Sequence, residues 1–280
     1  MTRAGQGKRA VLDLFAGSGW GVALQQLDVP EYGVEIMKEA IETRRINGME
    51  TVYTDAWDID LAAALDFDTM IASPSCQSFS MAGKGSGRKA LDDVLKAIED
   101  RRFESMDELR RLAEEVGDER TAHVLIPLAY IHRYRPIYVA LEQVPTVMPV
   151  WRAYAEVLEG WGYSVWTDVM HAEQYGVPQT RKRAILIARR DGKTVKPPVP
   201  THSRYYSHDP KRLDPGVEKW VSMAEALGRL AERPAPTVTG GGIMTGGWEP
   251  FGPGGRRAIK TSLSSAITGK AEIQQSEACA

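Results

Sequence analysis

The chain has 280 residues, of which 43% are hydrophobic and 26% are charged, and its formal net charge is -2. This length suits one large α/β domain with a small appendage, and the hydrophobic fraction is ordinary for a packed core. The sequence has no secretory signal and no apolar run of about 18 residues, so we expect a cytoplasmic protein with no membrane partner.

The first predicted element is a strand that begins near Val11 and runs into a glycine-rich turn. Gly17, Gly19 and Gly21 alternate with other residues there, and the apolar spacing that follows predicts a helix. Glycines let the backbone approach a ligand closely, and the helix N-terminus points at that ligand. The spacing differs from the Gly-x-Gly-x-x-Gly dinucleotide pattern, so the turn alone is weak evidence for a cofactor loop.

Acidic residues follow the next two strand-like runs. Glu35 comes directly after Tyr32–Val34, and Asp55 follows Thr51–Tyr53. At the end of a second strand an acid can accept hydrogen bonds from a ribose, and we expect the acid after the third to accept one from an adenine amino group. Each acid alone is more often a solvated loop residue. Their positions at successive strand ends favour a nucleotide-like cofactor.

The turn after the strand-like run Asp68–Ala72 carries Cys76, one of only two cysteines. The other, Cys279, is too distant to suggest a disulfide framework or a metal site. A free thiol has a pKa near about 8.5, and its thiolate is a strong nucleophile. Because lone cysteines are usually inert core residues, the nucleophile hypothesis depends on the neighbouring motifs.

Residues 90–119 interrupt the alternation of strands and helices. Apolar residues recur there at helical spacing among dense charges of both signs, at Leu91, Val94, Leu95 and Ile98. This pattern predicts a mobile helical insertion after the cysteine turn. An ordinary solvated surface is the alternative interpretation of its charged face.

Two later strand-like segments carry charged residues. Glu142 ends the apolar run Tyr138–Leu141, at the sheet edge where ligands bind, and desolvation there would raise its pKa and let it donate a proton to a ring nitrogen. Arg181 and Arg183 precede the strand-like Ala184–Ala188 and would point to opposite sides of an extended chain. One could meet phosphate and the other a pocket, although solubilising charge beside a strand is the alternative.

Basic residues outnumber acidic ones from Arg181 to Arg212, with ten Lys or Arg against Asp191 and Asp209. Histidines and tyrosines are interleaved with them, at His202, Tyr205, Tyr206 and His208. Such a local excess is typical of a surface that follows phosphates, although the net charge gives no such argument for the whole chain. A solvated loop is the alternative.

Together, these segments resemble the DNA cytosine carbon-5 methyltransferase family, in the same order and over roughly residues 9 to 190. Asp13–Gly21 resembles the family's S-adenosylmethionine loop, and Pro74-Ser75-Cys76-Gln77 resembles its nucleophile motif. Glu142-Gln143-Val144 resembles the Glu-Asn-Val motif, and Gln179–Arg183 resembles the Gln-x-Arg-x-Arg motif. Ser75 replaces a usual proline and Gln143 a usual asparagine, so we expect altered loop rigidity rather than altered chemistry.

The resemblance implies a Rossmann-like α/β fold of the S-adenosylmethionine-dependent methyltransferases, with a mostly parallel sheet that contains an antiparallel strand. It also implies methyl transfer to carbon 5 of a flipped-out cytosine in double-stranded DNA. Cys76 would add to carbon 6 while Glu142 contacts ring nitrogen 3, and Arg181 and Arg183 complete the catalytic set. Base flipping costs roughly a few kcal/mol, which phosphate contacts must offset.

The remaining expected site residues fall into two groups. The cofactor S-adenosylmethionine would contact Phe15, Gly17, Gly19, Glu35, Asp55 and Pro74. Nucleic acid would contact Gln77, Ser80, Arg120, Gln179 and Arg204. The alternatives are a catalytically weak, DNA-binding remnant that needs a partner chain, and a transfer RNA cytosine methyltransferase.

We expect a catalytic domain over residues 1–190, a short target-recognition region over 191–236 and a glycine-rich, flexible tail over 237–280. Pro236–Gly240 resembles the entry to the family's ninth motif, but the arginine- and leucine-rich helix and the Gly-Asn-Ala-Val segment that follow it in the family do not appear. In the family the last helix completes the cofactor site. Without it, we expect an uncovered apolar face and a second chain that supplies the missing motifs.

Overall fold

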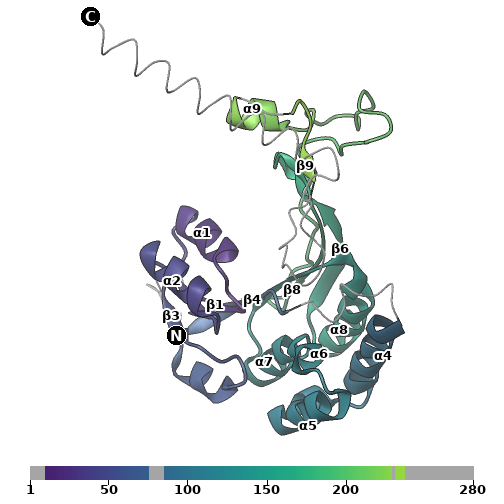
Figure 1. The fold of residues 1–280 in the computed structure, drawn as a ribbon. Coiled ribbons are helices and arrows are strands. Elements are labelled where there is room, and N and C mark those ends of the chain that lie inside the picture. Colours follow the sequence, from purple (N-terminus) through teal and green to yellow (C-terminus); the bar gives the residue numbers. More distant parts are fainter. Residues whose placement is uncertain (1–9, 76–84, 229–230, 237–280) are drawn as a thin grey trace, which may run out of the picture. The chain divides into compact units, whose positions relative to one another are not determined.

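The computed structural model describes residues 10–75, 85–228 and 231–236 (Figure 1). The chain forms two compact units that are not contiguous in sequence. The first unit holds the residues up to Met170 together with Lys182–Val199, and the second holds His171–Arg181 and the residues from Pro200 onward.

A seven-stranded sheet organises the first unit, in the order β3-β2-β1-β4-β5-β8-β6. Its strands are β1 (Ala10–Leu14), β2 (Glu31–Val34), β3 (Thr51–Tyr53), β4 (Phe67–Ala72), β5 (Tyr138–Gln143), β6 (Ser164–His171) and β8 (Lys182–Arg189). The pairs from β3 through β5 are parallel, whereas β5 and β8 are antiparallel. The predicted Rossmann-like α/β fold, with an antiparallel strand in a mostly parallel sheet, is confirmed.

The burial of each strand follows its sequence. All five residues of β1 are buried, as expected for a central strand with both faces covered. In β5, by contrast, Val139, Leu141 and Gln143 are buried while the alternating residues are partly or largely exposed, and β8 alternates in the same way. One face of the β5–β8 pair therefore packs into the core, and the other face remains accessible.

Helices connect the strands, and Figure 1 shows α4 to α8 gathered on one side of the first unit. The connecting helices are α1 (Gly19–Gln26), α2 (Lys38–Ile46), η1 (Ile59–Ala64), α4 (Gly85–Glu99), η2 (Arg102–Glu104), α5 (Met106–Val116), α6 (Glu119–His123), α7 (Ile126–Tyr134), η3 (Pro145–Val147) and α8 (Met148–Gly160). Their largest fully buried side chains include Trp151, Tyr130, Tyr154 and Phe103. No helix of the described ranges is long and apolar enough to cross a membrane.

The segment expected to form a mobile helical insertion is indeed helical, since it contains most of α4 and all of α5. Val94, Ile98, Leu109 and Leu112 on these helices are buried in the main core cluster. Fully buried apolar side chains each stabilise a fold by about 1.5–3 kcal/mol, so helices anchored in this way are costly to detach. The packing therefore argues against a freely moving insertion.

The second unit is mostly irregular. It contains η4 (Ala172–Tyr175), β7 (Gln179–Thr180), α9 (Met223–Leu227) and β9 (Ala235–Pro236), and β7 pairs with β9 in parallel. A capping box between Ser222 and Glu225 starts α9. Trp220 is buried, and its ring packs edge-on against Tyr205 with the centroids 4.9 Å apart. These contacts order a segment in which regular structure is sparse.

Candidate active site

The glycine-rich turn after β1 is linked directly to the acid after β2. The Gly17 N–H donates to Glu35 Oε2 at 2.8 Å, and the Met37 N–H donates to Glu35 Oε1 at 2.7 Å. Phe15 lies in the left-handed region with φ 58°, a conformation that costs a residue other than glycine roughly 1–3 kcal/mol and that clusters at functional sites. A Cβ built at Gly17 or Gly19 would meet nothing within 4 Å, so space is open beside this loop.

A buried arginine, Arg44, forms a hydrogen bond with this loop. Arg44 of α2 is fully buried, and its guanidinium donates to the Gly17 carbonyl at 3.3 Å and to the Glu50 carbonyl at 2.6 Å. It also pairs with Glu31 at 3.0 Å and donates to Thr51 Oγ1 at 3.1 Å. The Arg44 guanidinium therefore contacts the loop, β2 and β3 at the same time. Sequence reasoning missed Arg44, because it lies in a helix rich in other charges.

Asp13 of β1 belongs to the same charged cluster and is fully buried. Burial raises the pKa of Asp13 well above its ordinary value, and the neighbouring Glu31 carboxyl raises it further. The Arg44 guanidinium opposes both effects. The guanidinium pairs with Glu31 and acts on the nearby Asp13 carboxyl through its charge, so the buried cluster depends on Arg44 remaining in place.

Replacing Gly33 by alanine is expected to lower the free energy of unfolding by about 2–4 kcal/mol. The added Cβ would lie 1.9 Å from the Arg44 guanidinium, which cannot move away without losing buried partners. Urea denaturation would measure the change. Gly160→Ala is the matched control, since its Cβ meets nothing within 4 Å; it should be neutral or stabilising by up to about 1 kcal/mol. Equal stability of the two variants would contradict the role given to Arg44.

Aromatic rings extend the site from the glycine loop toward the end of β3. The Phe15 ring packs against His123 of α6 with the centroids 5.6 Å apart, and the Trp57 ring also packs against His123, with the centroids 6.1 Å apart. The backbone N–H of Trp57 donates to Asp55 Oδ1 at 2.9 Å, which fixes this carboxylate after β3. Phe15, Glu35 and Asp55 thus lie around the carboxyl ends of three adjacent strands, as the sequence predicted.

The turn that leads to Cys76 is anchored on two sides. The Gln143 amide donates to the Pro74 carbonyl, and its Oε1 accepts from the Val144 N–H at 2.5 Å. Trp20 of α1 donates from Nε1 to Ser73 Oγ at 3.0 Å. Gln143, which replaces the usual asparagine of the motif, therefore joins the end of β5 to this turn. Trp20 had no signal in the sequence that would have identified this role.

Glu142 and Arg183 form an ion pair at the end of β5, with 2.5 Å between Glu142 Oε1 and Arg183 Nε. The side chains are only 21% and 19% exposed. Antiparallel pairing of β5 with β8 produces this contact, because Glu142 lies opposite Ile185, two residues from Arg183. The guanidinium therefore orients the carboxylate at the ligand-binding edge of the sheet.

Other predicted site residues are placed separately. Cys76, Gln77 and Ser80 lie outside the described residues. Arg120 pairs with Asp118 at 2.8 Å on the surface of α6. The second unit holds three more predicted residues, Gln179, Arg181 and Arg204.

The sheet order, the open glycine loop and the polar residues at successive strand ends define a Rossmann-like methyltransferase fold. The model of the family described as C-5 cytosine-specific DNA methylase matches residues 10–97 and 115–239, and the chain belongs to this family. The unmatched interval between these ranges holds η2 and most of α5.

The sequence identity to individual relatives is 30% or less for those described next. The type II methyltransferase M1.HphI from Haemophilus parahaemolyticus is 27% identical over 77% of this chain and 56% of its own length. M.AquIA from a Picosynechococcus species is 30% identical over 62% of this chain and 64% of its own length. A solved structure of an Escherichia coli prophage protein, described as a DNA modification methyltransferase, is 17% identical over 80% of this chain and 56% of that chain, with a TM-score of 0.50. The chain thus spans about half the length of M1.HphI.

Proposed function

We propose that the chain transfers a methyl group from S-adenosylmethionine to carbon 5 of cytosine in double-stranded DNA. Family membership supports the reaction class, and the Glu142–Arg183 pair is the observation that carries the proposal. It lies at the end of β5, and Gln143 joins that strand end to the turn leading to Cys76. The type II methyltransferases among the relatives support a role in restriction and modification.

The residues of the first unit fit S-adenosylmethionine. Open space beside Gly17 and Gly19 admits a ligand close to the backbone, and Phe15 offers an aromatic face. Glu35 would bind the ribose and Asp55 the adenine amino group, with Pro74 at the reactive end. When bound, the cofactor supplies an electrophilic methyl group on its sulfonium.

In this proposal, the Cys76 thiolate forms a bond to carbon 6 of the flipped-out cytosine. Glu142 binds ring nitrogen 3 and stabilises the charge that develops in the ring, and Arg183 holds the Glu142 carboxylate in place. The added electron density makes carbon 5 nucleophilic enough to be methylated. Loss of the carbon-5 proton to a base and of the thiolate then restores the aromatic ring. Arg181 is the second cation proposed for this set.

DNA binding is proposed for Gln77, Ser80, Arg120, Gln179 and Arg204. The second unit contributes the clearest cationic feature. Arg204 and Arg212 both lie over the Tyr206 ring, with 5.8 Å and 4.1 Å between guanidinium carbon and ring centroid. Asp214 fixes this loop by accepting from the Tyr206 hydroxyl at 2.6 Å and from the Arg204 N–H at 2.8 Å. Two guanidinium groups held on one platform suit a DNA phosphate.

Replacing Arg204 and Arg212 together by glutamine is expected to reduce the slope of log K against log salt for DNA binding by about 2, since each phosphate contact contributes about 0.9. Fluorescence anisotropy of a labelled duplex from low to moderate salt would measure the slope. Arg45→Gln is the control, because Arg45 is an exposed arginine that already pairs with Glu42 in the first unit. An unchanged slope in the double variant would remove these two residues from the DNA interface.

A second chain is proposed to cover the accessible face of the β5–β8 pair. Tyr138, Ala140 and Ile187 line a groove there with a volume of about 750 Å³. An apolar segment that packs in this groove would cover the exposed face of this part of the sheet. Full activity of the purified chain alone would contradict the need for such a partner.

Adduct formation tests the proposed reaction. The purified chain would be incubated with labelled S-adenosylmethionine and a duplex containing 5-fluorocytosine, which prevents loss of the group at carbon 5. We expect a covalent complex that survives denaturing electrophoresis and carries the label. A duplex with unsubstituted cytosine is the control and should leave label in the DNA alone. If the chain binds DNA but forms neither the covalent complex nor labelled DNA, the result would support the DNA-binding remnant instead.

A further inference from the structure

His123 is a titratable side chain that the mechanism above leaves unused, although it lies within the proposed cofactor site. It is the last residue of α6, and its side chain is 21% exposed. Its ring packs against both Phe15 and Trp57, with the centroid distances of 5.6 Å and 6.1 Å given above. Phe15, the aromatic face of the proposed cofactor site, packs against His123, and Asp55, proposed to bind the adenine amino group, is close enough to act on it electrostatically.

We propose that His123 contacts the adenine of bound S-adenosylmethionine as a neutral imidazole, and that its protonation excludes the cofactor. This inference rests on the proposed cofactor site. An adenine lying against Phe15 with its amino group toward Asp55 would lie beside the His123 ring, which packs against Phe15. A flat, uncharged imidazole suits that contact, and the base would cover the fifth of the side chain that remains exposed.

The surroundings of His123 favour the neutral form. Its Nδ1 is buried and finds no hydrogen-bond partner among the described residues. Protonation would therefore place a donor N–H where nothing accepts it, which is costly. Nε2 lies 3.8 Å from Glu119, at the surface of the same helix. In the neutral imidazole with its proton on Nε2, the buried Nδ1 is only an acceptor, and leaving it without a hydrogen bond costs less than burying an unpaired N–H donor.

Burial lowers the pKa of His123 below its ordinary value, despite nearby acids that act in the opposite direction. These acids are Glu119 and Asp118 of α6 and its cap, and Asp55 of the loop after β3. Phe15 and Trp57, which pack against the ring from two other segments, carry no charge, although the Arg110 guanidinium lies over the Trp57 ring at 5.5 Å. A bound adenine removes more water from the ring and opposes protonation further.

Protonation of His123 and binding of the cofactor compete, and this competition sets the direction of the pH dependence. A group that must be neutral in the complex weakens binding as the pH falls through its pKa in the free protein. Affinity should therefore be constant above about pH 7 and fall at lower pH, by up to about tenfold at pH 5.5 relative to pH 7.5. Binding near pH 6 should also release a fraction of a proton.

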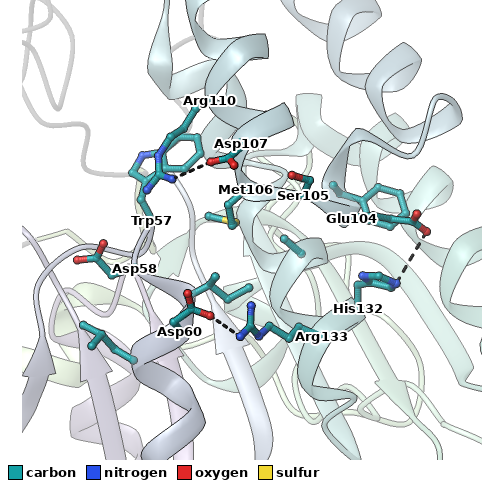
Figure 2. Close-up of a pocket in the computed structure, with 14 residues that line it drawn as sticks. Trp57, Asp58, Asp60, Glu104, Ser105, Met106, Asp107, Arg110, His132 and Arg133 are labelled. Carbon is teal, nitrogen blue, oxygen red and sulfur yellow. Dashed lines mark hydrogen bonds and ion pairs between the residues drawn. The ribbon is translucent and has the colours of Figure 1, made fainter.

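A second histidine provides a matched control. His132 of α7 lies in a groove of about 810 Å³ between η1 and the start of α5, where Figure 2 shows it directed at Glu104. The distance from its Nε2 to Glu104 is 3.8 Å. Burial lowers the pKa of His132 as well, but its ring packs against Phe103 and Trp161 rather than against Phe15. Only His123 should couple to the cofactor.

The test is calorimetric titration of the full chain with S-adenosylhomocysteine between pH 5.5 and 8, in two buffers with different ionisation enthalpies. The wild type and His132→Gln should both lose affinity at acidic pH and release protons near pH 6. His123→Leu keeps apolar packing, and His123→Gln provides a second neutral variant if leucine disturbs the fold. Both should bind with an affinity that does not change over this range.

The possible failures are distinguishable. Wild-type binding that is independent of pH, or a pH dependence that persists in both His123 variants, would overturn the role of His123 and leave the cofactor proposal standing. Absence of S-adenosylhomocysteine binding at every pH would overturn the cofactor proposal itself, and this inference with it.

Discussion

Replacing Cys76 by alanine is expected to abolish the covalent complex with 5-fluorocytosine DNA and to lower methyl transfer by at least about 10⁴-fold. Without the thiolate no bond forms at carbon 6, and carbon 5 of an aromatic cytosine ring is too weak a nucleophile to be methylated. Transfer of label from S-adenosylmethionine into unsubstituted DNA measures the rate, and denaturing electrophoresis measures the adduct.

Cys279→Ala is the matched control, because it removes the only other thiol of the chain. It should form the adduct at the wild-type rate. S-adenosylhomocysteine and DNA should still bind to Cys76→Ala, since the proposed contacts for both involve other residues. An adduct that survives in Cys76→Ala, or one lost in Cys279→Ala, would show that the nucleophile lies elsewhere.

The parts of the fold that could be predicted from sequence depend on local patterns. Apolar runs that end in polar residues identified β1 to β5, because a parallel sheet places its buried residues within strands and its ligand-binding residues just beyond them. The same rule placed Glu35, Asp55 and Glu142 at strand ends. Each of these residues is within a few positions of the apolar run that reveals it.

The missed features depend on contacts between distant segments. Arg44 is buried because Gly33, on a neighbouring strand, leaves room for its guanidinium, and neither residue shows this alone. Likewise, Trp20 reaches Ser73 across 53 positions in the sequence. The helices of residues 90–119 are dense in charge, yet the fold buries their apolar faces. Helical spacing predicted the helices, but it could not show what would cover them.

Removing the ion pair at the end of β5 is the second change expected to have a large effect. Glu142→Gln should lower kcat about 10³-fold, because the amide keeps the shape of the side chain but loses the charge and proton that act on ring nitrogen 3. Arg183→Gln should lower kcat about 10²-fold, because the carboxylate remains but loses the guanidinium 2.5 Å away that orients it. Affinity for S-adenosylhomocysteine should stay within about twofold in both, which separates this role from general unfolding.

The double variant decides whether Arg183 acts through Glu142. If it does, adding Arg183→Gln to Glu142→Gln should have little further effect, because the carboxylate to be oriented is already absent. Arg189→Gln is the matched control: Arg189 lies on the same strand and face but pairs with Asp191, so methyl transfer should remain near the wild-type rate. Multiplicative losses in the double variant would instead show that Arg183 acts on DNA independently of Glu142.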